Sequence, residues 1–258
     1  MQIALTIAGS DSGGGAGIQA DLKTFHQFGV HGTSVIVALT AQNTRGVRSV
    51  HAIPAGMVGD QLAAIAEDLP PAALKTGMLA SPALVRQVAE AIRGYGWPRP
   101  VVDPVMVATS GDRLLEAEAE AVIRESLVPL AAVVTPNLGE AAILAGMEVK
   151  DVASMERAGR RILDLGAAAV LVKGGHLTDT TLVDLLVTSS GTRRYQHPRV
   201  ATTSTHGTGC TLSAAITAGL ALGQPLETAV SDGIDYVRRG LLAAPGLGGG
   251  HGPLNHRV

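Results

Sequence analysis

Short aliphatic runs alternate with longer amphipathic stretches along the whole chain. The aliphatic runs are bounded by Gly, Pro or polar residues, which is typical of buried β-strands. Strands are expected at residues 3–8, 33–39, 73–77, 100–104, 132–136, 169–173, 182–188 and 192–199. The amphipathic stretches predict helices at residues 17–28, 54–69, 82–95, 114–127, 138–145, 152–165, 209–222 and 225–242.

This alternation predicts an α/β fold. Repeated strand–helix units form a mostly parallel central sheet with helices on both faces, and only the last two strands read as an antiparallel pair. No linker or change of composition divides the chain, so one domain spanning residues 1–258 is expected. Ligands of such sheets bind beyond the carboxyl ends of the strands, and the polar clusters of this sequence each follow a strand.

Composition narrows the class of protein. Hydrophobic residues make up 46% of the chain but aromatic ones only 2%, which suits helices packed closely on a sheet. The net charge of −2 offers no basic field for nucleic acid or an acidic membrane surface. One cysteine excludes an intrachain disulfide, and no apolar run is long enough for a signal peptide or a membrane span. A cytoplasmic location is therefore expected, and residues 246–258 are expected to form a tail or late loop.

The most informative stretch is a glycine turn that opens a helix near residue 209. Gly207, Thr208 and Gly209 bring consecutive backbone N–H groups together at the positive end of that helix, which predicts an anion site. Cys210 follows directly, and the helix end predicts a lowered thiol pKa. The alternative is an ordinary turn in which Cys210 is a small apolar filler.

A second glycine-rich segment, residues 9–17, follows the first strand. Its spacing matches neither a P-loop nor a dinucleotide fingerprint, so close approach of a small flat ligand is the better functional interpretation. Asp21 lies one helical turn further on, where a lone acid is more often solvated. Gln42 offers a carboxamide that complements an aminopyrimidine edge, and Met78 places a thioether where it can pack on a ring or belong to the core.

Acids and amides follow the strands in the middle of the chain. Asp103 and Glu140, with Asn137, could hold a hydrated Mg²⁺ beside phosphates, although Glu140 also suits a simple helix N-terminal acid. Lys173 stands on a glycine turn and could meet a nucleotide phosphate, and His206 could contact phosphate or lie at the surface.

Taken together, these segments resemble the hydroxymethylpyrimidine/phosphomethylpyrimidine kinases of thiamine biosynthesis, in the ribokinase-like superfamily. The resemblance is carried by residues 8–21, 40–44, 75–78, 103–105, 135–140, 172–176, 206–210 and 250–256. It implies a three-layer α/β/α fold and a homodimer. It also implies two phosphorylations that use ATP and Mg²⁺: 4-amino-5-hydroxymethyl-2-methylpyrimidine becomes its monophosphate and then its diphosphate.

The resemblance also assigns roles to individual residues. The substrate ring is met by Gln42, Asp21, Gly9, Met78 and Val105; the anion hole is formed by Gly207, Thr208 and Gly209; the metal environment contains Asp103 and Glu140; and the nucleotide lies near Asn137, Lys173 and His206. Cys210 stands where sugar kinases of the superfamily carry a catalytic aspartate, and is expected to orient or deprotonate the hydroxyl.

Three other interpretations stay open on the sequence alone. A pyridoxal kinase would use a similar pocket for another flat ring with a hydroxymethyl arm. A sugar kinase is disfavoured because Cys210 replaces the aspartate and no β insertion is evident after the first strand. A pyrimidine- or nucleotide-binding regulator would have no need of a phosphoryl-transfer site.

Overall fold

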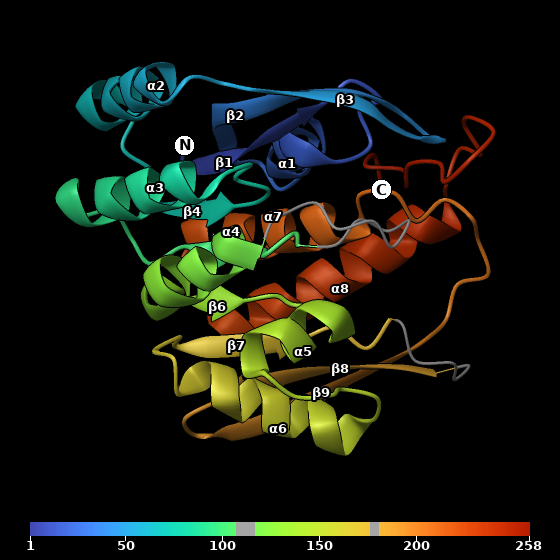
Figure 1. The fold of residues 1–258 in the computed structure, drawn as a ribbon. Helices are drawn as coiled ribbons and strands as arrows, with labels where there is room; N and C mark the ends of the chain where they lie inside the picture. Colours follow the sequence, from blue (N-terminus) through green and yellow to red (C-terminus); the bar gives the residue numbers. More distant parts are fainter. Residues whose placement is uncertain (107–116, 176–180) are drawn as a thin grey trace.

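A computed structural model describes residues 1–106, 117–175 and 181–258 of the chain. Its described residues contain one sheet of nine strands in the order β3-β2-β1-β4-β5-β6-β7-β8-β9 (Figure 1). Strands β1, β2, β4, β5, β6 and β7 are parallel, whereas β3, β8 and β9 pair antiparallel with their neighbours. The strands are β1 (Ile3–Asp11), β2 (His31–Asn43), β3 (Gly46–Ala52), β4 (Ala73–Thr76), β5 (Val101–Val102), β6 (Val133–Val134), β7 (Ala169–Val172), β8 (Thr181–Thr188) and β9 (Gly191–Pro198).

Helices cover both faces of this sheet. They are α1 (Gly17–Gln27), α2 (Ala55–Asp68), α3 (Pro82–Gly94), α4 (Ala117–Val122), α5 (Leu138–Ala145), α6 (Val152–Leu163), α7 (Thr208–Ala221) and α8 (Leu226–Leu242). Helices α1, α7 and α8 pack together on one face, and α2 to α6 cover the other, which gives three layers (Figure 1). The expected α/β/α fold class is confirmed. Residues 114–116 of the helix expected at 114–127 lie outside the described residues.

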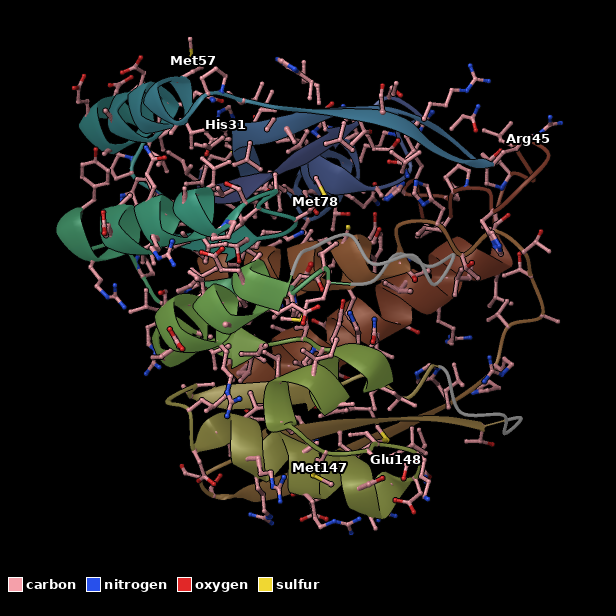
Figure 2. The ribbon with its side chains drawn as sticks, in the orientation of Figure 1. His31, Arg45, Met57, Met78, Met147 and Glu148 are labelled. Carbon is pink, nitrogen blue, oxygen red and sulfur yellow. The ribbon has the colours of Figure 1, made fainter. Side chains whose placement is uncertain are left out.

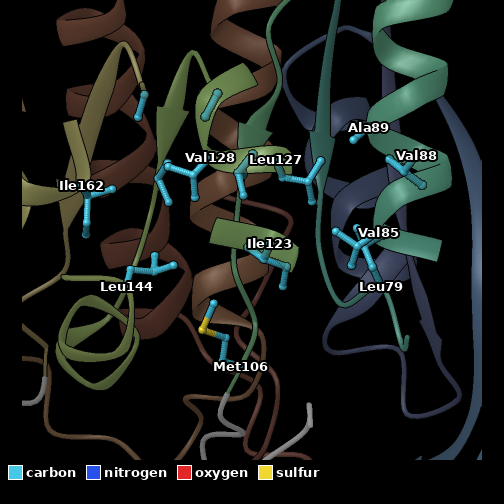
Figure 3. Packing of buried hydrophobic residues seen from close by; sticks show 14 of the residues in the cluster. Leu79, Val85, Val88, Ala89, Met106, Ile123, Leu127, Val128, Leu144 and Ile162 are labelled. Carbon is cyan, nitrogen blue, oxygen red and sulfur yellow. The ribbon is translucent and has the colours of Figure 1, made fainter. Parts of the chain in front are cut away.

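The two faces of the sheet are packed differently. On the side of α2 to α6, branched aliphatic side chains form the larger core, with Val85, Leu127 and Leu144 among its members (Figure 3). On the other side the buried face of α7 consists mainly of small residues, such as Ala214 and Ala218. Small side chains let α7 lie close to the sheet and to α1 and α8, which fixes the position of its N-terminus.

Strand β3 and the outer part of β2 were not expected from the sequence. All seven residues of β3 are exposed, so its sequence has no buried face to produce an alternating pattern. The first strand is also longer than expected, because residues 9–11 continue the pairing with β2.

Of the expected tail or late loop, the last residues form a loop, and it is packed against the rest of the fold. The backbone N–H of His206 donates to the carbonyl of Gly252 over 3.1 Å, and that of Asn255 donates to the carbonyl of Gly240 over 3.0 Å. His256 is buried, and its Nε2 lies 3.0 Å from Thr211 Oγ1 in the first turns of α7. Residues 252–256 are therefore a part of the fold that supports the start of α7.

No helix within residues 1–106, 117–175 and 181–258 is long and apolar enough to cross a membrane.

Candidate active site

The polar segments singled out in the sequence follow neighbouring parallel strands at one edge of the sheet. Asp11 ends β1, Gln42 lies near the end of β2, Asp103 follows β5 and Lys173 follows β7. Strands β1, β2, β4, β5, β6 and β7 run in the same direction, so their carboxyl ends meet at this edge. The N-terminus of α7 approaches the same edge, because α7 packs against β1, β4 and β5.

The predicted anion hole is the first turn of α7. Gly207 is its N-cap residue, with φ of 82°, and a Cβ there would also collide with the carbonyl oxygen of Gly15. Only glycine satisfies both conditions without strain. The N–H groups at the start of a helix have no partners within the helix, so those of Gly209 and Cys210 are available to an anion.

A charged pair lies against this turn. A Cβ on Gly209 would be 3.2 Å from Lys173 Nζ and 3.8 Å from Asp103 Oδ2, which shows how closely both side chains approach the backbone. Lys173 Nζ is 3.4 Å from Asp103 Oδ1. Burial works against protonation of Lys173, but the charges of Asp103 and Glu140 and the hydrogen bond to Asp103 together outweigh it and raise the pKa of the ammonium. The predicted phosphate-binding lysine is thus beside the predicted anion hole.

Asp103 is buried, yet its side-chain contacts with other described residues are long. Its carboxylate is 3.4 Å from Thr135 Oγ1 and 3.3 Å from Ser213 Oγ. Oxygens held this loosely can accept stronger partners, so Asp103 suits a hydrated cation that carries most of its own ligands as water.

Glu140 is engaged differently. With Asn137 it forms a capping box at the start of α5: Asn137 Oδ1 accepts from the Glu140 N–H, and Glu140 Oε2 accepts from the Asn137 N–H, both over 2.9 Å. Its other oxygen accepts from the Met106 N–H over 3.2 Å. Burial, together with the charge of Asp103, raises the pKa of Glu140. Both oxygens of Glu140 thus already accept a backbone N–H, and one lone pair remains on each.

Asn137 forms a β-bridge with Lys173, so the capping box adjoins the lysine turn. The structure thus brings Asp103, Glu140, Asn137 and Lys173 together. His176, the last residue of the segment 172–176 that carries part of the family resemblance, lies outside the described residues.

The lowered pKa expected for Cys210 is wrong. Burial raises the pKa of the thiol to about 11; the ammonium of Lys75 opposes this rise, and the carboxylates of Asp21 and Asp103 add to it. The expectation rested on the helix end alone, and burial outweighs that local field.

Beneath Cys210 lies a buried ion pair that sequence reasoning missed. Lys75 Nζ is 2.7 Å from Asp21 Oδ1, and Thr6 Oγ1 donates to Asp21 Oδ2 over 2.6 Å. Neither charged side chain has any exposed surface, so the expectation of a solvated Asp21 is wrong. Burial raises the pKa of Asp21, and Lys75 counters that rise. A lysine within an otherwise apolar strand is the signal that would have predicted such a partner.

The remaining residues predicted to contact the substrate ring lie near the ends of β1, β4 and β5. A Cβ on Gly9 would be 2.8 Å from Met78 Cε, so the thioether covers the backbone of β1 at this point (Figure 2 labels Met78). Val105 has φ of 43°, which is a rare conformation for a β-branched residue. Such strain is found most often where a site demands a particular backbone path.

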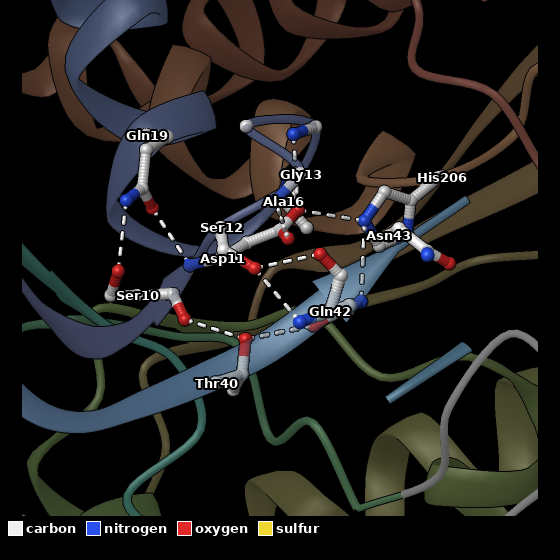
Figure 4. A network of polar contacts seen from close by, with 12 residues as sticks. Ser10, Asp11, Ser12, Gly13, Ala16, Gln19, Thr40, Gln42, Asn43 and His206 are labelled. Atoms are coloured by element: carbon white, nitrogen blue, oxygen red, sulfur yellow. Dashed lines mark hydrogen bonds and ion pairs between the residues drawn. The ribbon is translucent and has the colours of Figure 1, made fainter. Parts of the chain in front are cut away.

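Gln42 and His206 meet in a polar network around Asp11 (Figure 4). Asp11 accepts hydrogen bonds from the N–H groups of Gly13, Gly15 and Ala16, over 2.8, 3.0 and 2.8 Å. Its Oδ2 is also 2.8 Å from His206 Nε2, which in turn lies 3.4 Å from Gln42 Nε2. His206, predicted beside the nucleotide, thus contacts the residue predicted to recognise the ring. Asp11 was not singled out, although an acid within a glycine-rich turn is a common acceptor for its N–H groups.

Several known proteins similar to this chain are named as kinases. The family model for phosphomethylpyrimidine kinase matches residues 11–255. The chain is 52% identical over 257 residues to the hydroxymethylpyrimidine/phosphomethylpyrimidine kinase of Rhizobium meliloti, covering 98% of this chain and 96% of that one. It is 48% identical over 252 residues to the thiamine biosynthesis bifunctional protein of Geobacter sulfurreducens, and the match covers 98% of this chain but 51% of that protein.

Solved structures agree with these relatives. The phosphomethylpyrimidine kinase of Clostridium difficile has 44% identity and a TM-score of 0.84, covering 93% of this chain and 99% of the other. A pyridoxal kinase of Bacillus subtilis, solved as an ADP complex, has 38% identity and a TM-score of 0.93, covering 99% and 97%. The ribokinase-like fold expected from the sequence is confirmed, and the chain belongs to the phosphomethylpyrimidine kinase family.

Proposed function

We propose that this chain transfers phosphate from ATP to the hydroxymethyl group of 4-amino-5-hydroxymethyl-2-methylpyrimidine, and then phosphorylates the monophosphate to the diphosphate. The observation that carries the proposal is the first turn of α7. Its free N–H groups face the Lys173–Asp103 pair on one side, and the network of Gln42 and His206 lies next to it through the contact of Gly207 with Gly15. A phosphoryl group bound at this turn would lie between the nucleotide that donates it and the ring alcohol that accepts it.

The nucleotide is proposed to lie on the Lys173 side of this turn. A groove there is lined by apolar residues such as Leu182, Leu212 and Val237 together with the charged or polar Asp184, His197 and Arg238. It shares lining residues with a hollow of about 980 Å³ bounded by residues 198–204 and the end of α8. Leu212 is two residues beyond Cys210, so a base in the groove would place its phosphates near the anion hole. Asn137 and Lys173 would then adjoin the phosphates.

Mg²⁺ fits this arrangement in part. The described residues contain no cluster of three or more His, Cys, Asp or Glu side chains placed to hold a metal ion. Mg²⁺ at phosphates commonly uses one or two carboxylates and keeps several waters. Asp103 would hold the ion, and Glu140 would act through water. When bound, the ion would neutralise charge on the phosphate oxygens.

The residues of the chain supply positioning and charge stabilisation, which dominate phosphoryl transfer. The N–H groups of Gly209 and Cys210 would donate hydrogen bonds to the transferred group and stabilise the negative charge that develops on it. One such donor contributes about 3 kcal/mol. The Cys210 thiol would orient the attacking hydroxyl. Gly9, Met78 and Val105 would form the walls around the ring, and Asp21 would support them from below through Lys75.

Pyridoxal is the second candidate substrate. It is favoured by the TM-score of 0.93 to a pyridoxal kinase. Both rings are flat and carry a hydroxymethyl arm, so the same walls and anion hole would accept either.

The test is phosphate transfer from ATP with Mg²⁺ to each alcohol, with separation of mono- and diphosphate products. Diphosphate from the pyrimidine and a much poorer reaction with pyridoxal support the proposal. Preference for pyridoxal with arrest at the monophosphate would replace it with the second candidate, and no transfer to either would contradict both.

Copies of the chain are expected to pair as homodimers in the cytoplasm. The support for pairing is three large apolar side chains that are about half exposed, at 45%, 53% and 54%: Leu39 and Val50 on opposite faces of the β2–β3 hairpin, and Met57 on α2. Light scattering on wild type and Val50→Lys tests this: a dimer that the charge disrupts supports it, and a wild-type monomer contradicts it.

A further inference from the structure

The amide of Gln42 lies between a histidine and a threonine, and these neighbours decide which way it points. Thr40 Oγ1 is 3.2 Å from Gln42 Oε1, and His206 Nε2 is 3.4 Å from Gln42 Nε2. The oxygen of an amide only accepts hydrogen bonds and its nitrogen only donates them, so the partners distinguish the two ends. The hydrogen positions around Gln42 therefore fix its true orientation.

Asp11 determines that the Nε2 atom of His206 carries a proton. Burial opposes ionisation of Asp11, but the hydrogen bonds from His206 and from the N–H groups of Ala16 and Gly13 outweigh it and lower the pKa of the carboxyl. An ionised carboxylate only accepts hydrogen bonds. His206 Nε2, 2.8 Å from Asp11 Oδ2, must therefore carry a proton and donate it.

The hydroxyl proton of Thr40 also already has an acceptor. Thr40 Oγ1 donates to the carbonyl of Ser10 over 2.9 Å, and a hydroxyl has one proton. Thr40 can therefore only accept from Gln42. The single Nε2 proton of His206 points at Asp11, and a protonated ring nitrogen has no lone pair, so His206 cannot accept from the amide and presents only the positive edge of its N–H to it. Both conditions are met when the Gln42 amide is turned by 180°, so that its oxygen faces His206 and its nitrogen faces Thr40.

We propose that Asp11 and His206 lock the Gln42 amide in this single orientation and make it a discriminating reader of the substrate ring. One lone pair of Oε1 and one N–H of Nε2 are used internally. One acceptor and one donor remain, in a fixed order. This pair matches a ring that presents an amino group beside a ring nitrogen, and it mismatches a ring that presents a carbonyl beside a ring N–H.

The backbone around the lock is held firmly. Ser12 Oγ donates to the Gln42 carbonyl over 2.7 Å and accepts from the Gln42 N–H over 2.8 Å. A Cβ on Gly15 would be 2.6 Å from His206 Cδ2, so the imidazole is packed against the glycine-rich turn. Because His206 immediately precedes Gly207, the lock joins ring recognition to the anion hole.

The first experiment measures the protonation of His206 directly. Long-range ¹H–¹⁵N spectra of the free protein at pH 7.5 should show a proton on Nε2, with the signal assigned by its loss in His206→Leu. An unprotonated Nε2 would overturn the lock, because that nitrogen could then accept from the Gln42 amide. This readout does not depend on activity.

The second experiment rests on the proposed function and compares kcat/KM for the 4-amino alcohol and its 4-oxo analogue. Wild type should prefer the 4-amino ring by at least about 100-fold, because mismatched buried polar groups are costly. His206→Leu should lose about tenfold or more of that preference, while His206→Gln, which keeps a donor, should restore most of it. His251→Leu removes an exposed imidazole nearby and serves as the matched control.

The outcomes separate the two proposals. Wild type that is active on the 4-amino alcohol, with an unchanged preference in His206→Leu, overturns the lock alone. Wild type that is inactive on both pyrimidines contradicts the proposed function, and the histidine spectra still decide the lock.

Discussion

The thiol of Cys210 should ionise only in strongly alkaline solution. Its pKa is raised from the ordinary value of 9.0 to about 11. Two pH units correspond to about 2.7 kcal/mol and to about 100-fold less thiolate at any pH below 9. At neutral pH the residue is a thiol. It can orient a hydroxyl by hydrogen bonding, but it is not a thiolate that could act as a general base.

Alkylation tests this cleanly because Cys210 is the only cysteine of the chain. The rate with iodoacetamide follows the thiolate fraction, so for the native protein it should rise about tenfold per pH unit from pH 7 to pH 10 without levelling. The chain unfolded in guanidinium is the control, and its rate should level near the ordinary pKa of a cysteine.

The pKa of Cys210 is read from how the alkylation rate changes with pH and not from the absolute rate, because burial also slows access of the reagent at every pH. A native profile that levels below pH 9 would refute the argument. It would show that the helix end, which the sequence alone suggested, and Lys75 together dominate over burial.

Three further outcomes are expected. Gly207→Ala should lower kcat about 100-fold or more, because its Cβ meets the Gly15 carbonyl and moves the anion hole, whereas Gly223→Ala, with a similar φ of 80° and open surroundings, should leave kcat nearly unchanged. Cys210→Ala should slow the first phosphorylation more than the second, whose acceptor is already anionic; equal losses in product-resolved assays would contradict this. Burial lowers the pKa of His256 from 6.5 to about 4, so the unfolded chain binds that proton more readily, and stability falls as pH drops from 6.5 towards 4. Urea unfolding at pH 7 and pH 5 should show about 2 kcal/mol of this loss in wild type and not in His256→Gln; the same loss in both would refute the assignment.

The layers of the fold were predictable because they depend on local pattern. Buried strands such as β7 are continuous apolar runs, and α6 shows a clear amphipathic period. Strand β3 was not predictable for the same reason, since all its residues are exposed. Its pairing with β2 comes from backbone hydrogen bonds, which leave no trace in side-chain pattern.

The site shows the same division between local and distant causes. The turn of Gly207 was recognisable because its chemistry lies within four consecutive residues. The ion pair of Lys75 with Asp21 joins residues 54 positions apart, and nothing in either segment identifies the partner. The pKa of Cys210 was misjudged because burial by neighbouring elements is a tertiary property.

The contact of residues 252–256 with the start of α7 has a consequence for the order in which the protein becomes active. Strand β1 leaves the ribosome long before the segment that accepts the His206 N–H and touches Thr211. A partly synthesised chain could assemble most of the sheet, yet its anion hole would lack this support. Competence for phosphoryl transfer should therefore appear only after residues 252–256 have been synthesised and have packed against the start of α7.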